Sequence, residues 1–136
     1  MKSSEKQFVD TNIFIYTLFK VDSAKHQACI GLFEEAAQGK VKLWTSQWVI
    51  AEVVWFLTRK RMSWERIRSV VEKIIQTRGL EVADKDVLFE VMKECESGED
   101  FVDGLNVVLA KREGINLGYS YDKGLGKRQG FKRLEP

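Results

Sequence analysis

Four acidic residues in this 136-residue chain occupy positions where a carboxylate needs an explanation. The first, Asp10, ends a short apolar run, and two small polar residues, Thr11 and Asn12, follow it before a second apolar run begins. This order predicts a buried strand, a turn and a helix, with Asp10 at the carboxyl end of the strand and Thr11 or Asn12 as the helix N-cap. Ligands bind outside the carboxyl ends of strands in open α/β sheets, which makes Asp10 a candidate site residue. The alternative is that Asp10 only helps to cap the helix.

The second acidic residue, Glu52, lies inside an apolar stretch with helical spacing. Its neighbours three and four positions away are Trp48, Val49, Trp55 and Phe56, whereas a surface helix would place polar residues there. Burying a carboxylate among such side chains is costly unless it is paired or binds a cation. Glu52 is therefore a candidate metal ligand; the alternative is that it points out of a narrow gap or pairs with an arginine.

The remaining two acidic residues lie in the C-terminal third of the chain. Asp103 falls in the first turns of a predicted helix that is otherwise strongly apolar, with Val102 and Leu105 beside it. Asp122 follows Ser120 by two positions at the end of a predicted strand, so that a hydroxyl and a carboxylate lie close together. Taken alone, this last pair is a turn motif.

Taken together, the four carboxylates predict a metal site. Two follow strands and two lie on helices that follow or flank strands, so we expect them to converge at one edge of the sheet. Four mutually repelling carboxylates are stable together only around cations. Ligation by oxygen alone suits Mg²⁺ or Mn²⁺, and such sites usually hydrolyse phosphodiesters. The proposed ligands are Asp10, Glu52, Asp103 and Asp122.

The elements that must position these residues alternate between strands and helices. This alternation predicts a three-layer α/β/α fold, with a mainly parallel central sheet and helices on both faces, formed by a single domain over residues 1–136. Beyond the opening strand, strands are predicted at 41–45, 80–82 and 115–120, with an edge strand at 131–134. Helices are predicted at 13–19, 24–38, 47–60, 84–95 and 100–113, and one more begins after Ser63 and ends at Gly79.

Composition narrows the class of protein. A hydrophobic content of 44% and a charged content of 31% fit a soluble globular protein, and no apolar run approaches the roughly 18 residues of a membrane span. The polar N-terminus does not resemble a signal peptide, so a cytoplasmic protein is expected. Cys29 and Cys95 lie among apolar neighbours and are expected to be buried thiols. The single histidine, His26, leaves almost nothing for a Ser-His-Asp triad or a His-rich zinc site.

Charge is unevenly distributed along the chain although the net charge is only +2. Residues 59–78 contain seven basic and two acidic residues, residues 81–103 contain nine acidic and two basic, and residues 111–136 contain seven basic and three acidic. Solvated helix faces would produce such blocks. An enzyme that binds a polyanion around an acidic, metal-holding centre would produce them as well.

At four points the sequence resembles the PIN-domain ribonucleases, most closely the VapC-like toxins of toxin–antitoxin pairs. The resemblance covers almost the whole chain and rests on residues 9–12, 51–53, 100–105 and 120–122. It implies that Asp10, Glu52, Asp103 and Asp122 are the acidic metal-site residues, supported by Thr11 or Asn12 and by Ser120. The family more often has threonine at the position of Ser120 and alanine at that of Gly104, and neither departure removes a ligand.

The resemblance implies a metal-dependent endoribonuclease. One or two Mg²⁺ ions held by Asp10, Asp103 and either Glu52 or Asp122 would activate a water for attack on the RNA phosphate. The family also implies a homodimer, neutralised by a small antitoxin laid over the active site. Basic residues expected to hold the RNA backbone, unless they are only solvated surface, are Arg59, Lys60, Arg61, Arg66, Arg68, Lys127, Arg128 and Lys132.

Two alternatives remain open from the sequence. In the first, the fold is kept while catalysis is weak or lost, and the protein is an RNA- or partner-binding module. In the second, Asp10 is a phosphate-accepting nucleophile, as in receiver domains or haloacid-dehalogenase-like phosphatases. The phosphatases require a second aspartate where this chain has Asn12, and receivers require a paired acid that residues 8–9 do not offer. Neither accounts for Glu52.

Overall fold

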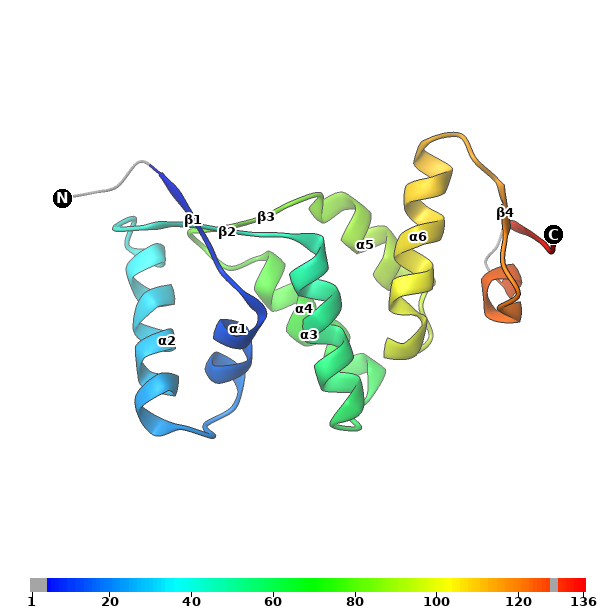
Figure 1. Ribbon diagram of the computed structural model, residues 1–136. Coiled ribbons are helices and arrows are strands. Elements are labelled where there is room, and N and C mark those ends of the chain that lie inside the picture. The colour runs from blue at the N-terminus through cyan, green and yellow to red at the C-terminus, as the bar shows by residue number, and fades with distance from the viewer. Residues whose placement is uncertain (1–4, 128–129) are drawn as a thin grey trace.

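A computed structural model describes residues 5–127 and 130–136. Short parallel strands alternate with helices through most of this part of the chain, and the strands β1 to β3 run along one side with α1 to α4 extending from them (Figure 1). The elements are β1 (Lys6–Phe8), α1 (Thr11–Leu18), α2 (Ser23–Ala37), β2 (Lys42–Thr45), α3 (Gln47–Arg59), α4 (Trp64–Ile75), β3 (Leu80–Val82), α5 (Lys85–Glu94), the 3-10 helix η1 (Gly98–Asp100), α6 (Phe101–Arg112), β4 (Leu117–Tyr119), the 3-10 helix η2 (Lys123–Lys127) and β5 (Lys132–Leu134).

Helix starts follow the capping residues that the sequence provides. The hydroxyl of Ser46 accepts a hydrogen bond from the backbone N–H of Val49 at the start of α3, and the hydroxyl of Ser63 does the same at the start of α4. The prediction that Thr11 or Asn12 caps the first helix is wrong. Asp10 is the N-cap of α1, and its carboxylate accepts from the backbone N–H of the next residue.

The core lies around α3, which carries the longest run of buried side chains. Val53, Leu57 and Ile50 have no exposed surface, and α3 contacts α1, α4, η1 and α6. On α4 an apolar stripe is buried, with Ile67 and Val71 nearly inaccessible to solvent. Burial of these side chains is the main stabilising contribution to the fold. Cys29 and Cys95 are buried, as predicted.

The first sheet contains β1, β2 and β3 in that order, and both pairs of strands are parallel. Phe8 lies opposite Trp44, and Trp44 lies opposite Glu81. The parallel pairing predicted from the strand–helix alternation is therefore confirmed. Among the described strands, β1 forms one outer edge of this sheet.

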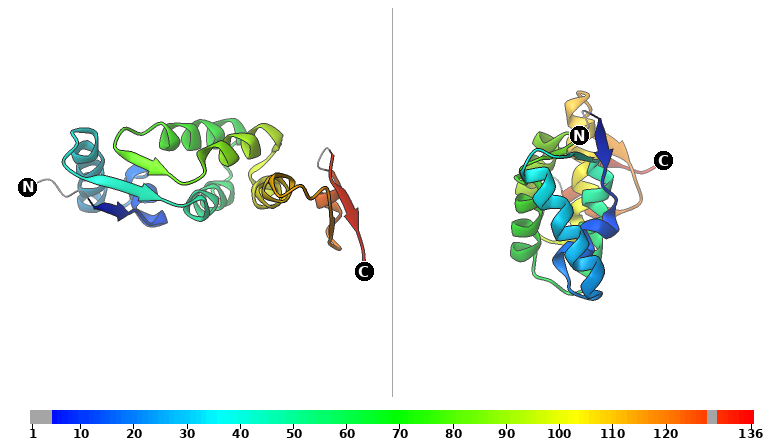
Figure 2. Two further views of the ribbon diagram at one scale, coloured as in Figure 1. Left: turned by 90° about the horizontal axis from the view of Figure 1, so that it is seen from above. Right: turned by 90° about the vertical axis from the view of Figure 1, so that its left-hand side faces the viewer.

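The last two strands form a second, separate sheet. β4 pairs with β5 in parallel, and both lie at the far end of the molecule, with α6 between them and the first sheet (Figures 1 and 2). The end of α6 explains this position. Gly114 has a positive φ of 78°, its N–H bonds to the carbonyl of Lys111 at 2.9 Å, and the N–H of Ile115 bonds to the carbonyl of Ala110 at 2.9 Å. This pair of bonds is a Schellman motif, which fixes the direction in which the chain leaves the helix.

Of the helices in the described ranges, none combines the length and the apolar character needed to cross a membrane.

Candidate functional site

Asp10 and Glu52 are brought together by Thr11. The Asp10 carboxylate accepts a hydrogen bond from the backbone N–H of Thr11 at 2.8 Å, and the Thr11 hydroxyl donates to Oε2 of Glu52 at 2.5 Å. One threonine in the first turn of α1 thus contacts a carboxylate from the end of β1 and a carboxylate from α3. Asn12, the other predicted supporting residue, is exposed in the same turn.

Thr45 fixes the end of β1 from the neighbouring strand. Its side chain is fully buried, and its hydroxyl donates to the carbonyl oxygen of Val9 at 2.8 Å, while the N–H of Val9 donates to the carbonyl of Trp44 at 2.9 Å. Asp10 follows Val9 directly, so these bonds hold the backbone that carries the carboxylate. Thr45 was not predicted from the sequence as a site residue. Its position at the end of the second predicted strand, level with the end of the first, was the available signal.

Gln47 is a second residue that the sequence analysis did not identify. It begins α3 directly after the end of β2, near the carboxyl end of β1, and its Oε1 atom is buried with no hydrogen-bond partner among the described residues. A buried acceptor without a donor is costly, and such atoms are rare in folded proteins.

Glu52 is exposed, which corrects the expectation that its apolar neighbours bury it. It lies on the outer stripe of α3 between Trp48 and Trp55, whose side chains are 58% and 55% exposed. The guanidinium of Arg59 lies over the ring of Trp55, 5.6 Å from its centroid. Because the Glu52 carboxylate is exposed, no free-energy cost of burial has to be offset by a bound cation at this residue. The unusual feature of this stripe is the large exposed aromatic surface on both sides of the carboxylate.

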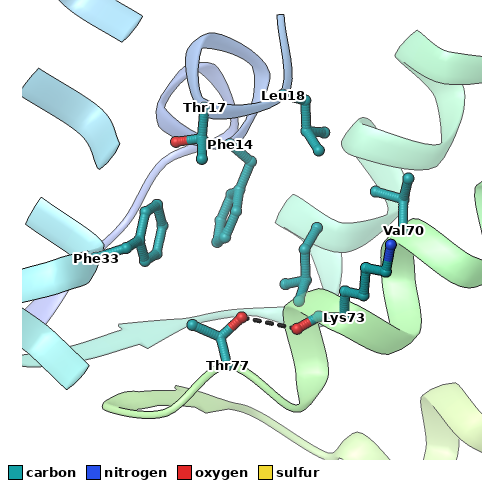
Figure 3. A pocket seen from close by; sticks show the side chains of 8 residues that line it. Phe14, Thr17, Leu18, Phe33, Val70, Lys73 and Thr77 are labelled. Carbon is teal, nitrogen blue, oxygen red and sulfur yellow. Dashed lines mark hydrogen bonds between the residues drawn. The ribbon is translucent and has the colours of Figure 1, made fainter. Parts of the chain in front are cut away.

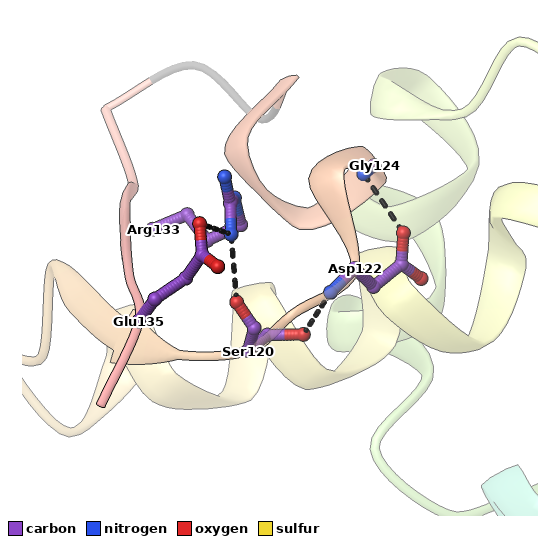
Figure 4. Close-up of polar contacts among 5 residues, drawn as sticks. All are labelled: Ser120, Asp122, Gly124, Arg133 and Glu135. Atoms are coloured by element: carbon purple, nitrogen blue, oxygen red, sulfur yellow. Dashed lines mark hydrogen bonds and ion pairs between the residues drawn. The ribbon is translucent and has the colours of Figure 1, made fainter.

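Asp122 and Asp103 border a second small space, at Gly124. Oδ1 of Asp122 accepts from the N–H of Gly124 at 2.8 Å, and the hydroxyl of Ser120 accepts from the N–H of Asp122 at 2.9 Å (Figure 4). A Cβ atom placed on Gly124 would lie 3.1 Å from Oδ1 of Asp122 and 3.9 Å from Oδ2 of Asp103. Both carboxylates therefore face the same point, and the glycine leaves the space between them open.

The four predicted ligands thus form two pairs in one chain, Asp10 with Glu52 and Asp103 with Asp122. Within residues 5–127 and 130–136, no three His, Cys, Asp or Glu side chains are grouped closely enough to hold one metal ion. The chemistry of each pair still fits Mg²⁺, which proteins often bind through one or two carboxylates together with water and phosphate oxygens. A site with all four carboxylates is not present within the described chain.

The predicted RNA-binding cations whose side chains the structure describes are all exposed. Arg133, which the sequence analysis did not include, has a structural role, because it donates to the carbonyl of Ser120 at 2.9 Å and lies 3.0 Å from the carboxylate of Glu135 (Figure 4). Arg68 forms an ion pair with Glu72 at 3.8 Å. Arg128 lies outside the described residues. The exposed members of the predicted set are Arg59, Lys60, Arg61, Arg66, Arg68 and Lys132.

An apolar cavity of about 280 Å³ lies between α1, α2 and α4 (Figure 3). Its lining includes Phe14, Phe33 and Val70, with Lys73 as its one cation, and none of the four predicted acidic ligands lines it. Such a lining does not suit a polyanion.

Comparison with known proteins identifies the family. Residues 8–130 match the PIN domain. The chain belongs to the PIN-domain family. This confirms the resemblance and the α/β fold class inferred from the sequence. Two similar proteins come from Aquifex aeolicus (strain VF5): Ribonuclease VapC1, 30% identical over 123 residues (89% of this chain and 84% of that protein), and a VapC ribonuclease, 32% identical over 133 residues (96% of each). A crystal structure of Mycobacterium tuberculosis VapC20, described as a sarcin-ricin loop cleaving toxin, aligns over 97% of this chain and all of that chain with 22% identity and a TM-score of 0.42.

Proposed function

We propose that the protein is a Mg²⁺- or Mn²⁺-dependent endoribonuclease and the toxin of a type II toxin–antitoxin pair. The observation that carries this proposal is the similarity to two VapC ribonucleases at about one-third identity over nearly the whole chain. The carboxylate pair at the end of β1 supports it, because Asp10 and Glu52 supply the hard oxygen donors that these cations prefer.

In this proposal the metal is held by Asp10 and Glu52, and Asp103 and Asp122, which form a separate pair within the described chain, are further ligands that must be brought to it. A bound divalent cation supplies an activated water at neutral pH and stabilises negative charge on the phosphate. The chain's own residues prepare the site for it. Thr11 orients Glu52 through its hydroxyl and Asp10 through its N–H, and Thr45 fixes the strand end from within the core.

The proposed partners are RNA and a small antitoxin protein. Exposed cations on α3 and α4, among them Arg59 and Arg66, would contact phosphates, and such binding weakens as salt rises. Trp48 and Trp55 give the outer stripe of α3 the exposed aromatic surface that is typical of the central part of a protein interface. An antitoxin bound there would cover Glu52. A cytoplasmic location is part of the same proposal.

The test compares RNA cleavage by the wild type with cleavage by Asp10→Asn and Asp22→Asn, in Mn²⁺ or Mg²⁺ and in EDTA. The two aspartates are matched because each is an exposed N-cap, of α1 and of α2 respectively. Asparagine caps helices as well as aspartate does, so both substitutions keep the cap and remove only the charge. We expect Asp10→Asn to lose at least about a hundredfold in rate, because a catalytic metal supplies several kcal/mol, and Asp22→Asn to stay near wild type.

The outcomes separate the proposal from its alternative. Metal-dependent cleavage that is lost only in Asp10→Asn supports the ribonuclease. Equal, metal-independent behaviour of all three proteins contradicts it. The absence of a single four-carboxylate cluster within the described chain gives the binding-module alternative its one specific support, and retention of RNA without cleavage under any metal condition would establish that alternative.

A further inference from the structure

The outer edge of β1 is open to another strand. The N–H of Val9 and its carbonyl both face β2, through Trp44 and Thr45. Because backbone groups alternate in direction along a parallel strand, those of Phe8 face away from β2, at an edge that no other described strand covers. The Phe8 side chain is 59% exposed at this edge. Open, apolar edges of this kind readily pair with a further strand.

The outer edge of β4 has the same character. The N–H of Ser120 donates to Leu134 of β5, and the carbonyl of Asn116 accepts from Lys132 of β5, so the backbone groups of Leu117 and Tyr119 face the opposite side. The side chains of Leu117 and Tyr119 are 51% and 70% exposed. β1 and β4 are each three residues long, and each ends near an acidic residue of the candidate site.

The structure holds these two edges apart within one chain. The C-terminal unit, consisting of β4, η2 and β5, leaves α6 through the Schellman motif at Gly114 and packs back on α6 through η2. Only Ile115 and Asn116 separate Gly114 from β4. Two views of the molecule place the C-terminal unit at the end opposite β1 (Figures 1 and 2). With so short a connection, β4 is directed away from the β1 of its own chain.

We propose that two copies of the chain form a domain-swapped dimer in which β4 of each pairs in parallel with β1 of the other. The backbone groups that face the two open edges fit a register in which Phe8 lies between Leu117 and Tyr119, opposite Gly118. When two copies exchange these edges with each other, the arrangement is two-fold symmetric and closed, and both edges are paired.

The dimer assembles the four carboxylates that one chain keeps apart. In this register Asp10 of one copy lies opposite Ser120 of the other. Asp122 of that second copy then approaches Asp10 and Glu52 of the first, and Asp103, which faces the same point at Gly124 as Asp122 does, approaches with it. The catalytic part of this inference rests on the proposed function, whereas the strand pairing does not.

The pairing is tested first by cross-linking the wild-type protein, prepared as a mixture of unlabelled and ¹⁵N-labelled chains. Lys6 in β1 and Lys132 in β5 would lie about two strand spacings apart in the swapped sheet, on the order of 10 Å. We expect an amine-reactive cross-linker to join them in peptides that combine one light and one labelled chain, and light scattering to give a dimer mass. Lys6–Lys132 links confined to single chains, no such link at all, or a monomer mass would overturn the pairing.

The shared site is tested next by mixing inactive variants after joint refolding, which lets chains exchange. Asp10→Asn and Asp122→Asn change opposite halves of the site, so each mixed dimer regains one site with all four carboxylates. Half of the dimers would be mixed, giving about a quarter of wild-type cleavage. The control mixture, Asp10→Asn with Glu52→Gln, changes the same half and should regain nothing. Equal recovery in both mixtures, or none in either while the wild type cleaves RNA, would overturn the shared site.

The two experiments keep the proposals separable. Mixed-isotope links in a protein that never cleaves RNA would support the swapped dimer and contradict the proposed ribonuclease. Cleavage by a wild type whose links stay within single chains would support the ribonuclease and contradict the swap.

Discussion

Replacing Thr11 by valine removes one hydrogen-bond donor from the candidate site and almost nothing else. Valine has the shape of threonine, so packing at the start of α1 is preserved, while the hydroxyl that donates to Oε2 of Glu52 at 2.5 Å is lost. A hydrogen bond to a charged group contributes about 1.5–3 kcal/mol. Because Glu52 is exposed and water can replace part of the bond, we expect about 1 kcal/mol at this position.

Because this bond holds Glu52 in one orientation, its loss should weaken the binding of Mn²⁺ by at most that energy, roughly fivefold, since about 1.4 kcal/mol is tenfold. Isothermal titration calorimetry with Mn²⁺ measures the effect directly. Thr11→Ser keeps the hydroxyl and should bind within about twofold of wild type. Thr17→Val is the matched control on the same helix, because the Thr17 hydroxyl donates to the carbonyl of Ile13 and does not contact a carboxylate. Equal Mn²⁺ affinity in wild type and Thr11→Val, or an equal loss in Thr11→Val and Thr11→Ser, would refute the role given to this hydroxyl.

Two further predictions concern stability and are measured by urea unfolding. Gly79→Ala should destabilise the fold by more than about 3 kcal/mol, because φ is +86° and the new Cβ would lie 2.2 Å from the carbonyl oxygen of Ala36. The control is Gly39→Ala, which has a similar φ of +77° but open space around the new Cβ, and should cost only about 1–2 kcal/mol. Equal losses of stability in the two variants would contradict the predicted clash with Ala36. Thr45→Val should lower the free energy of unfolding by about 1–2 kcal/mol, because the buried Val9 carbonyl loses the hydroxyl donor. A melting temperature unchanged within about 1 °C would contradict this role of the hydroxyl.

Local signals in the sequence predicted the helices and the first sheet well. Ser46 and Ser63 cap α3 and α4 just before the predicted helices begin, and β3 spans residues 80–82 as predicted, because capping chemistry and hydrophobic spacing act within a few residues. The N-cap of α1 was assigned one or two positions late. Asp10 serves both as the residue after the strand and as the cap, a double role that spacing alone does not reveal.

Longer-range features were harder to predict. The helix that carries Glu52 and its apolar neighbours was predicted correctly. Periodicity does not say which of these side chains another element covers, however, and the stripe of α3 that contains Glu52 is exposed. The separation of β4 and β5 from the first sheet has a similar origin. A run of alternating residues predicts a strand at 115–120, but not which strand pairs with it, because pairing depends on the direction fixed at Gly114. The proposed site divides in the same way. Asp10 and Glu52 both contact Thr11, whereas Asp122 follows β4 and lies with the second sheet.

Calorimetric titration of Mn²⁺ into the wild type, Asp10→Asn and Asp22→Asn shows whether a metal is held by the carboxylate at the end of β1. We expect saturable binding to the wild type and to Asp22→Asn, with binding to Asp10→Asn weakened at least about tenfold. Equal binding by all three proteins, or no binding to the wild type, would contradict this expectation.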